Sequence, residues 1–334
     1  MTRALVIGTG YGAQVVAPAL QALGRFAAVD VVAGRGQPQR LEDLLAADAV
    51  DFVVIAVPPK AQAAMVARAR RAGRTVLVEK PAGLAPGQIA PSPGRVFVGY
   101  EFRFMRGLDK WLALSSAGAV GPLRRVEFDW RIGGWAKPDR PWSWRCLAEE
   151  GGGALQDLAV HELDLLRCLT QAPIQSVKDV KVGVRHKVRA RADGSQAAVT
   201  APDMLAMNLT LSDGLVASFR IETALDQPVG HRIIAKGDSG TLEWFHPAPF
   251  LSGTETLMGQ GTAMSVYDLP LDAGGASDTR IAAFTRMVEA IFDGTAAVAQ
   301  PEDSDRVLRD VALIDAAIDE VRGTGPKAVE CADV

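Results

Sequence analysis

Three polar residues lie on one predicted helix, roughly residues 154–169, at positions that a buried helix face should not need. Asp157, His161 and Asp164 are spaced i, i+4 and i+7, so their side chains project from one side of the helix. An imidazole there can exchange a proton with an alcohol near neutral pH, and a carboxylate can fix its tautomer and tune its basicity. The alternative is a core histidine whose hydrogen bonds are satisfied internally. We expect Asp164 to anchor structure.

A lysine stands at the end of a predicted strand, residues 75–79 (TVLVE). Lys80 follows this strand directly and Pro81 comes next. Open parallel sheets bind their ligands at the carboxyl ends of the strands. A lysine in that place can hydrogen-bond a substrate hydroxyl and assist its proton transfer, with Glu79 and Pro81 fixing its position.

A glycine-rich turn follows the first apolar run, residues 4–7. It fits the pattern G-x-G-x-x-G/A and consists of Gly8, Thr9, Gly10, Tyr11, Gly12 and Ala13. In this pattern the first glycine permits a tight turn, the second lets the backbone approach a pyrophosphate, and the third small residue lets helix and strand pack closely. The N-terminus of the next helix adds N–H groups for the phosphates. At a strand-to-helix junction the pattern predicts dinucleotide binding, and the alternative is a turn without a ligand.

The end of the second predicted strand, residues 29–33, indicates which dinucleotide binds. An acid there would bind the ribose 2′-hydroxyl of NAD, and a basic residue would accommodate the 2′-phosphate of NADP. The chain has Gly34 and Arg35 at this point and no acid. Because a guanidinium pairs with phosphate in two-point geometry, we expect NADP(H) to be favoured over NAD(H). The alternative is a solvated loop arginine.

The elements that must position these residues change in character near residue 101. Before it, short apolar runs alternate with helical segments; the runs are 4–7, 29–33, 52–57, 75–79 and 96–100. This alternation predicts an α/β domain, a parallel sheet covered on both faces, over residues 1–101.

After residue 101 the segments alternate between apolar and polar residues, as at 123–130, 204–211 and 215–222. Asp213-Gly214 separates the last two as a hairpin turn. We therefore predict an α+β domain over residues 102–334, a predominantly antiparallel sheet flanked by helices. The spacing of apolar residues predicts helices over residues 278–322. The basic run 185–191, which includes His186, reads as a solvated strand face, and His231 and His246 show no partner pattern.

Three segments together resemble the glucose-fructose oxidoreductase, inositol dehydrogenase and MocA (Gfo/Idh/MocA) family. They are Ala56-Val57-Pro58-Pro59, Glu79-Lys80-Pro81 and the glycine-led run from Gly151 to Asp164. Supporting matches are Gly99-Tyr100, Arg103-Phe104, Trp144-Arg145 and the run from Gly237 to Leu242. The matches occur in the expected order through nearly the whole chain, which makes the first domain a Rossmann domain.

The resemblance assigns roles to individual residues. It implies a catalytic group of Lys80, His161 and Asp157 and a cis peptide bond between Lys80 and Pro81. We expect His161 to donate or accept the proton, Lys80 to orient the substrate and relay the proton, and Asp157 to contact the substrate or modulate the site. The implied cofactor contacts beyond the glycine turn, Gly34 and Arg35 are Ala56, Val57, Pro58, Pro59, Glu79, Lys80 and Glu101. The expected substrate contacts are Lys80, Arg103, Trp144, Arg145, Asp157 and His161.

The chain departs from the family pattern in two ways. Glu101 stands where most relatives have asparagine, and Ala159 where glycine is usual. Only 17 residues separate Gly34 from Phe52 and only 14 lie between Pro81 and Val96, so one crossover unit in each place is expected to be shortened or lost. We therefore expect an abbreviated Rossmann domain.

The resemblance implies an oxidoreductase that transfers a hydride between a nicotinamide cofactor and a sugar, cyclitol or sugar-like hydroxyl or carbonyl. Two alternatives stay open: reduction of a carbon–nitrogen double bond in a biosynthetic pathway, and a non-catalytic, cofactor-sensing regulatory protein. The family also implies a homodimer or homotetramer formed through the sheet of the second domain.

Composition fits such a protein. The 334 residues include 36 Lys and Arg and 39 Asp and Glu. This balance lacks the excess of positive charge that binding to nucleic acid or to an anionic membrane needs. No apolar run reaches the length of a membrane span. The three cysteines, Cys146, Cys168 and Cys331, have neither metal-ligand spacing nor the pattern of a disulfide framework. We therefore expect no metal site and a cytoplasmic protein. The expected partner is a small-molecule substrate.

Overall fold

The computed structural model describes residues 2–247, 254–261, 267–270, 279–295 and 298–324. They divide into two compact units. The first unit holds the chain up to Met105 together with the described part of Asp272–Leu308, and the second holds the remainder.

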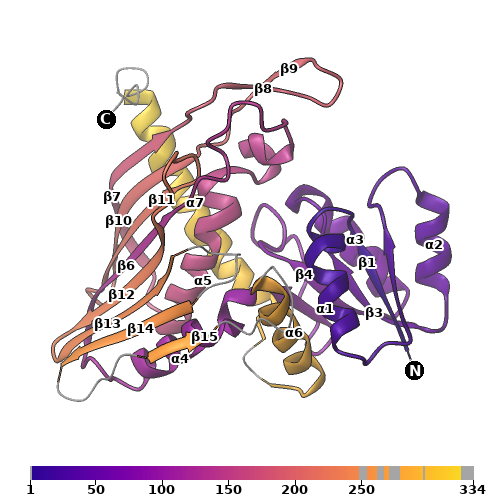
Figure 1. Ribbon diagram of the computed structural model, residues 1–334, viewed down its shortest axis with the longest axis horizontal. Helices are drawn as coiled ribbons and strands as arrows, with labels where there is room; N and C mark the ends of the chain where they lie inside the picture. Colours follow the sequence, from indigo (N-terminus) through magenta and orange to yellow (C-terminus); the bar gives the residue numbers. More distant parts are fainter. Residues whose placement is uncertain (1, 248–253, 262–266, 271–278, 296–297, 325–334) are drawn as a thin grey trace. The chain divides into compact units, whose positions relative to one another are not determined.

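The first unit is built on a five-stranded parallel sheet (Figure 1). Its order is β2-β1-β3-β4-β5, with β1 at Arg3–Ile7, β2 at Ala28–Val32, β3 at Val50–Ile55, β4 at Thr75–Glu79 and β5 at Val96–Gly99. All four strand pairs are parallel, so every strand presents its carboxyl end at one edge. These strands are the predicted apolar runs, which the structure buries because helices cover both faces.

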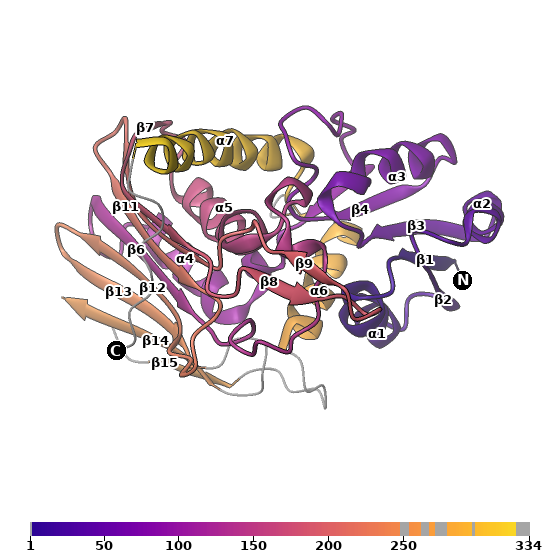
Figure 2. The ribbon, with the colours of Figure 1, turned by 90° about the horizontal axis from the view of Figure 1, so that it is seen from above.

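Helices link the first four strands. They are η1 (Gly12–Val16), α1 (Ala17–Ala22), α2 (Pro38–Ala46) and α3 (Pro59–Arg71), and α1 and α3 lie on opposite faces of the sheet (Figure 2). The π-helical segment η1 precedes α1, and Pro18 stands in the first turn of α1. Proline is tolerated there because the first turn of a helix leaves its N–H groups unpaired in any case.

The expected abbreviation of this sheet is present. The first short connection keeps one nine-residue helix, α2. The second, residues 80–95 between β4 and β5, contains turns and bends but no helix. The predicted Rossmann arrangement is therefore confirmed with one crossover helix missing.

The chain returns to the first unit near its end. Helix α6 (Thr279–Phe292) places Phe284, Met287 and Val288 in the same apolar core as Leu20 and Phe52. Helix α7 (Pro301–Thr324) contributes its first turns, to Leu308, to this unit. The domain boundary predicted at residue 101 placed α6 in the second domain. The sequence of an amphipathic helix shows that one face is buried but not which distant core that face covers.

The second unit contains an eight-stranded, mostly antiparallel sheet, as predicted. Its order is β15-β14-β13-β12-β6-β11-β10-β7, and only β6 and β11 pair in parallel. The strands are β6 (Leu123–Arg131), β7 (Ile174–Gly183), β10 (Met204–Leu211), β11 (Val216–Glu222), β12 (Gly230–Gly237), β13 (Gly240–His246), β14 (Thr254–Gly261) and β15 (Tyr267–Pro270). A separate ribbon pairs β8 (Val188–Ala190) with β9 (Gln196–Ala198).

One face of this sheet is apolar and covered. Along β6, Val126, Phe128 and Trp130 are buried and alternate with charged residues. Helices α4 (Arg106–Ser116) and α5 (Val160–Leu169) pack on the buried side (Figure 2). Short helical turns lead into α5: η3 (Trp144–Cys146), η4 (Ala148–Glu150) and the π-helical η5 (Ala154–Ala159), while η2 (Glu101–Phe104) belongs to the first unit.

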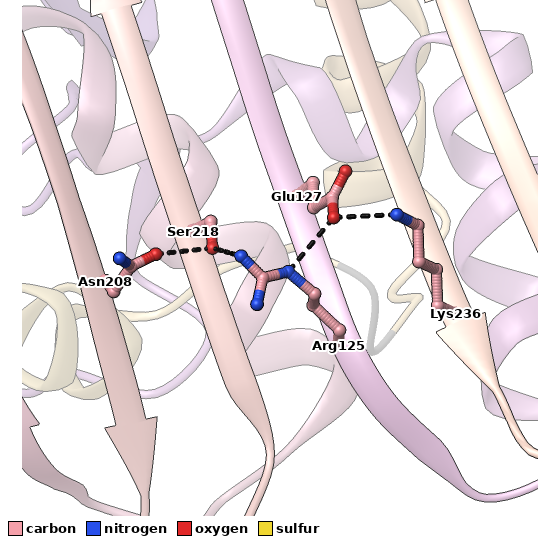
Figure 3. Close-up of polar contacts among 5 residues, drawn as sticks. All are labelled: Arg125, Glu127, Asn208, Ser218 and Lys236. Carbon is pink, nitrogen blue, oxygen red and sulfur yellow. Dashed lines mark hydrogen bonds and ion pairs between the residues drawn. The ribbon is translucent and has the colours of Figure 1, made fainter.

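The opposite face of the sheet is polar. A row of hydrogen bonds and ion pairs crosses four strands there (Figure 3). Lys236 Nζ lies 2.8 Å from Glu127 Oε1, which also accepts from Arg125 Nε at 3.0 Å. Arg125 Nη2 donates to Ser218 Oγ at 2.5 Å, and that hydroxyl donates to Asn208 Oδ1 at 2.6 Å.

Candidate active site

The glycine turn is pressed against the end of β3. Gly8 has φ +135°, and a Cβ on it would lie 2.2 Å from the carbonyl oxygen of Ala56. A Cβ on Gly12 would lie 2.9 Å from Val6 Cγ1, whereas one on Gly10 would meet no atom within 4 Å. Gly8 and Gly12 are therefore glycine for packing, and Gly10, the second glycine of the pattern, leaves backbone open. This arrangement fits a pyrophosphate approaching the turn.

The end of β2 lies beside the same turn. A Cβ on Gly34 would lie 2.8 Å from Val57 Cγ1, so this glycine also allows close packing. Arg35 follows it and is exposed. Within the part of the chain that the structure describes, no ion pair or hydrogen bond engages its guanidinium. The group is therefore available to an anionic ligand.

Lys80 stands at the carboxyl end of β4 in a segment fixed by buried hydrogen bonds. The Lys80–Pro81 peptide bond is cis. Gln62, from α3 and only 1% exposed, donates to the carbonyl of Glu79 at 2.8 Å and accepts from the N–H of Gly83 at 2.8 Å. On the other side, the Ser304 hydroxyl of α7 accepts from the N–H of Ala82 at 2.9 Å. Sequence reasoning did not find Gln62 or Ser304, because neither belongs to a motif.

Two acidic side chains are buried beside this lysine. Glu79 is 8% exposed and Glu101 3% exposed, and Glu79 pairs in register with Gly99, two residues before Glu101. Burial, followed by the negative charge of Glu101, raises the pKa of Glu79 well above its ordinary value against the positive charges of Lys80 and Arg280. Burial also raises the pKa of Glu101, again opposed by Lys80. The pair therefore holds a proton more readily than exposed carboxylates do.

Aromatic and basic residues complete the set of candidate residues in the first unit. Tyr11 Oη donates to Glu101 Oε1 at 3.4 Å, and the Arg280 Cζ lies 5.2 Å from the centroid of the Tyr11 ring. Arg280 comes from α6 and was not predicted. Arg103, a predicted substrate contact, has its Cζ 5.9 Å from the centroid of the Tyr100 ring.

In the second unit the structure brings Arg145 and Asp157 together. Arg145 Nε donates to Asp157 Oδ2 at 2.8 Å, and its Cζ lies 4.5 Å from the centroid of the Trp144 ring. The glycines before η5 make this contact possible, since a Cβ on Gly152 would lie 2.3 Å from the carbonyl oxygen of Arg145. The substrate contacts predicted at 144, 145 and 157 therefore form one cluster.

His161 is buried in α5 of the same unit. It is 3% exposed, and its ring centroid lies 6.2 Å from that of Trp130 in an edge-on arrangement. Trp130 stacks in turn on His231, with centroids 4.5 Å apart. His231 Nε2 lies 2.5 Å from Glu162 Oε1, and both side chains are almost wholly buried.

Comparison with known proteins gives the family. Residues 2–90 match an oxidoreductase family with an NAD-binding Rossmann fold, and residues 110–243 match the GFO/IDH/MocA C-terminal domain. An uncharacterized oxidoreductase of Synechocystis sp. is 31% identical over 259 residues, which cover 71% of this chain and 70% of that protein. This chain belongs to the Gfo/Idh/MocA family.

Solved structures share the fold of this Gfo/Idh/MocA member. An oxidoreductase domain protein from Kribbella flavida has a TM-score of 0.76 at 19% identity, covering 96% of this chain and 98% of that one. A levoglucosan dehydrogenase in complex with NADH and L-sorbose has a TM-score of 0.75 at 16% identity, covering 96% and 97%. At these identities the likeness shows the fold.

The candidate residues of this Gfo/Idh/MocA chain fall into two sets. The first unit carries the glycine turn, Gly34, Arg35, the 56–59 segment, Glu79, Lys80, Glu101 and Arg103; the second carries Trp144, Arg145, Asp157 and His161. Among the described residues, no group of three His, Cys, Asp or Glu side chains could hold a metal ion. None of the described helices has the length and apolar composition to cross a membrane.

The structure gives distant partners to basic residues that showed none in the sequence, and one expectation about them is wrong. His231 showed no partner pattern, and its Nε2 lies 2.5 Å from Glu162 Oε1 in the buried interior. The run 185–191 was read as a solvated strand face, yet Arg189 is 2% exposed and His186 Nε2 lies 2.7 Å from the carbonyl oxygen of Ala136. The partners lie about 70 and 50 residues away in sequence, so no local pattern reveals them.

Proposed function

We propose that this protein is an oxidoreductase that uses NADP(H) in preference to NAD(H) and acts on the carbon–oxygen bond of a sugar, cyclitol or sugar-like metabolite. One observation carries the proposal: the glycine turn after β1 and Lys80 after β4 lie at the same edge of one parallel sheet. This edge is where open α/β sheets bind cofactor and substrate.

The cofactor contacts follow from the first unit. The turn from Gly8 to Ala13 would hold the pyrophosphate, and Arg35 would pair with the 2′-phosphate of NADP. The 56–59 segment, Glu79, Lys80 and Glu101 would line the path toward the nicotinamide. A bound nicotinamide supplies or accepts the hydride.

The resemblance to the family assigns the handling of the proton to Lys80, His161 and Asp157. Lys80 hydrogen-bonds the reacting hydroxyl and orients it. In the oxidation direction, His161 accepts the hydroxyl proton at a ring nitrogen, and in the reduction direction it returns a proton to the carbonyl oxygen. Asp157, held by Arg145, contacts the substrate and modulates the site. Arg103 and Trp144 contact the substrate as well.

The proposal also covers the oligomeric state and the cellular location of the protein. The polar face of the second sheet, with both charge signs interspersed (Figure 3), supports a self-complementary contact between copies of this chain, as a homodimer or homotetramer. A cytoplasmic location completes the proposal.

Turnover by purified protein tests the proposal. With NADPH and a panel of keto-sugars and cyclic imines, we expect loss of reduced-nicotinamide absorbance with a keto-sugar. His161→Ala and Lys80→Ala should each lower kcat by roughly 10²- to 10⁴-fold, the usual contribution of a positioned acid–base group. Lys178→Ala, an exposed lysine on β7, is the matched control.

The outcomes separate the alternatives. Turnover of imines alone would identify a carbon–nitrogen reductase. Tight NADPH binding without turnover of any compound would identify a cofactor-sensing protein and overturn the proposal.

A further inference from the structure

Three guanidinium groups gather around one loop of the second unit. We call Arg140, Arg145 and Arg189 the arginine cluster. Arg140 comes from the loop between β6 and η3, Arg145 from η3 itself, and Arg189 from β8. Positive charge on Arg145 and on Arg189 acts on Arg140, so the three lie within electrostatic reach of one another.

Arg189 is the structural member of the cluster. It is 2% exposed, and its two terminal nitrogens donate to carbonyl oxygens of the loop. Nη2 donates to Trp135 at 2.6 Å, and Nη1 donates to Lys137 at 2.8 Å and to Arg140 at 3.2 Å. Arg189 therefore fixes the loop that carries Arg140 and leads into η3.

The guanidinium groups of Arg140 and Arg145 each lie over a tryptophan ring. Arg140 Cζ lies 4.0 Å from the centroid of Trp135, whose ring also contacts Arg189 at 5.2 Å. Arg140 Nη1 donates to the carbonyl of Gly134. Arg145 lies against Trp144 in the same manner. Stacking orients a guanidinium plane while leaving its edge available for hydrogen bonding.

The cluster is short of negative charge. Asp157 pairs with Arg145, but only through the Nε of that arginine. Within the described residues, Arg140 and Arg189 contact carbonyl oxygens and aromatic rings and no carboxylate. Partial burial, followed by the charges of Arg145 and Arg189, lowers the pKa of Arg140. Asp157 also acts on Arg140, and Arg189 acts on the carboxylate of Asp203, so three guanidiniums face two carboxylates and positive charge is in excess next to a predicted catalytic residue.

We propose that the substrate carries an anionic group, a carboxylate or a phosphate, that binds to Arg140 and Arg145 beside Asp157. This inference rests on the proposed function and narrows its substrate class from sugars in general to acidic or phosphorylated sugar-like compounds. Guanidiniums recognise both anions through paired N–H donors. The anion would supply the negative charge that the cluster lacks.

Binding of matched neutral and anionic sugars tests the inference independently of turnover. The probes are D-glucose, D-glucuronate and glucose 6-phosphate, titrated calorimetrically into the full chain saturated with NADP⁺. We expect one anion to bind at least tenfold more tightly than glucose. Tighter binding of D-glucuronate would identify a carboxylate as the anionic group, and tighter binding of glucose 6-phosphate would identify a phosphate.

Arg140→Gln should lower the affinity for the preferred anion by roughly 10- to 100-fold, the effect of losing a charge-assisted pair. Arg140→Lys should restore part of it, since lysine keeps the charge without the planar fork. Arg140 is exposed, so the variant is expected to fold. The matched control is Arg124→Gln, an exposed arginine paired with Asp238 on the sheet, which should bind as the wild type does.

Four results distinguish the claims. Equal affinity for glucose and both anions overturns the inference, as does an anion preference that Arg140→Gln leaves unchanged. Weaker NADPH binding in Arg140→Gln with no change for the sugars assigns the cluster to the cofactor and also overturns it. Arg140-dependent anion binding without hydride transfer to or from any compound supports the anion site and contradicts the proposed function.

Discussion

Glu79 and Glu101 bury two carboxyl groups at the ends of neighbouring strands. Their pKa values are raised by burial, and that of Glu79 also by the charge of Glu101. A carboxyl whose pKa is raised by folding binds its proton more tightly in the folded chain. Its favourable contribution is therefore complete below the ordinary value of 4.5 and is lost as pH rises through the raised pKa.

Removing one of these charges should stabilise the first unit at alkaline pH. We expect Glu101→Gln to raise the melting temperature at pH 8 by about 2–4 °C, the shift that 1 kcal/mol gives in a domain of this size. The difference should shrink as pH falls toward 5, because the wild-type carboxyl then gains its own proton. Asp51→Asn, an exposed acid of β3, is the control. A difference that is the same at both pH values would contradict the assignment.

Arg35 decides cofactor choice in our proposal. Arg35→Asp should weaken NADPH binding by roughly 10- to 100-fold and leave NADH binding equal or stronger, because it exchanges a phosphate partner for a hydroxyl partner. Fluorescence titration with both cofactors measures this. Arg40→Asp, an exposed arginine of α2, makes the same charge change outside the turn. An unchanged NADPH to NADH ratio in Arg35→Asp would refute this reading of β2.

Residue types in motifs were predictable, but their buried partners were not. Lys80 could be found from a strand end and a following proline, yet Gln62 and Ser304, which fix the backbone around it, come from two helices distant in sequence. The same holds for the buried contact of His231 with Glu162. Hydrogen bonds of this kind depend on tertiary packing, which local spacing does not encode.

At the scale of elements, sequence periodicity located strands well. The predicted segment 204–211 is β10 residue for residue, because a sheet with one covered face imposes strict alternation. The parallel strands of the first unit were equally visible as short apolar runs. Register and turn chemistry at Asp213-Gly214 also match the expected hairpin, with Gly214 at φ +86°.

Helices were predicted less completely. The π-helical segments η1 and η5 lie where simple 3.6-residue periodicity was assumed. In η5 the wider turn precedes His161, so the predicted spacing with Asp157 is not that of a regular helix. The structure also gives Asp157 a partner that helical spacing does not predict, Arg145, whose Nε lies 2.8 Å from Asp157 Oδ2.

At the scale of the whole molecule, the chain is discontinuous in space. The first unit takes its core from both ends of the sequence, since α6 packs on α1 beside the glycine turn. Sequence reasoning gave the order of folds correctly and the family with it. It could not assign α6, whose apolar face would suit either core.

The two units also divide the proposed chemistry. The cofactor residues and Lys80 belong to one unit, and His161, Asp157 and the arginine cluster to the other. The total of 36 basic and 39 acidic residues does not reveal the arginine cluster, because the cluster is a local excess of positive charge within a nearly neutral chain. Substrate selection and cofactor selection should therefore be separable by mutation.

The transfer of deuterium from nicotinamide-deuterated NADPH to a keto-sugar acid tests the central claim most directly. Mass spectrometry of the product should show one deuterium at the former carbonyl carbon, and His161→Ala should slow its appearance by roughly 10²-fold or more. Tight binding of the deuterated cofactor, with no deuterium in any neutral or acidic sugar or cyclic imine offered, would contradict the assignment of this protein as an oxidoreductase.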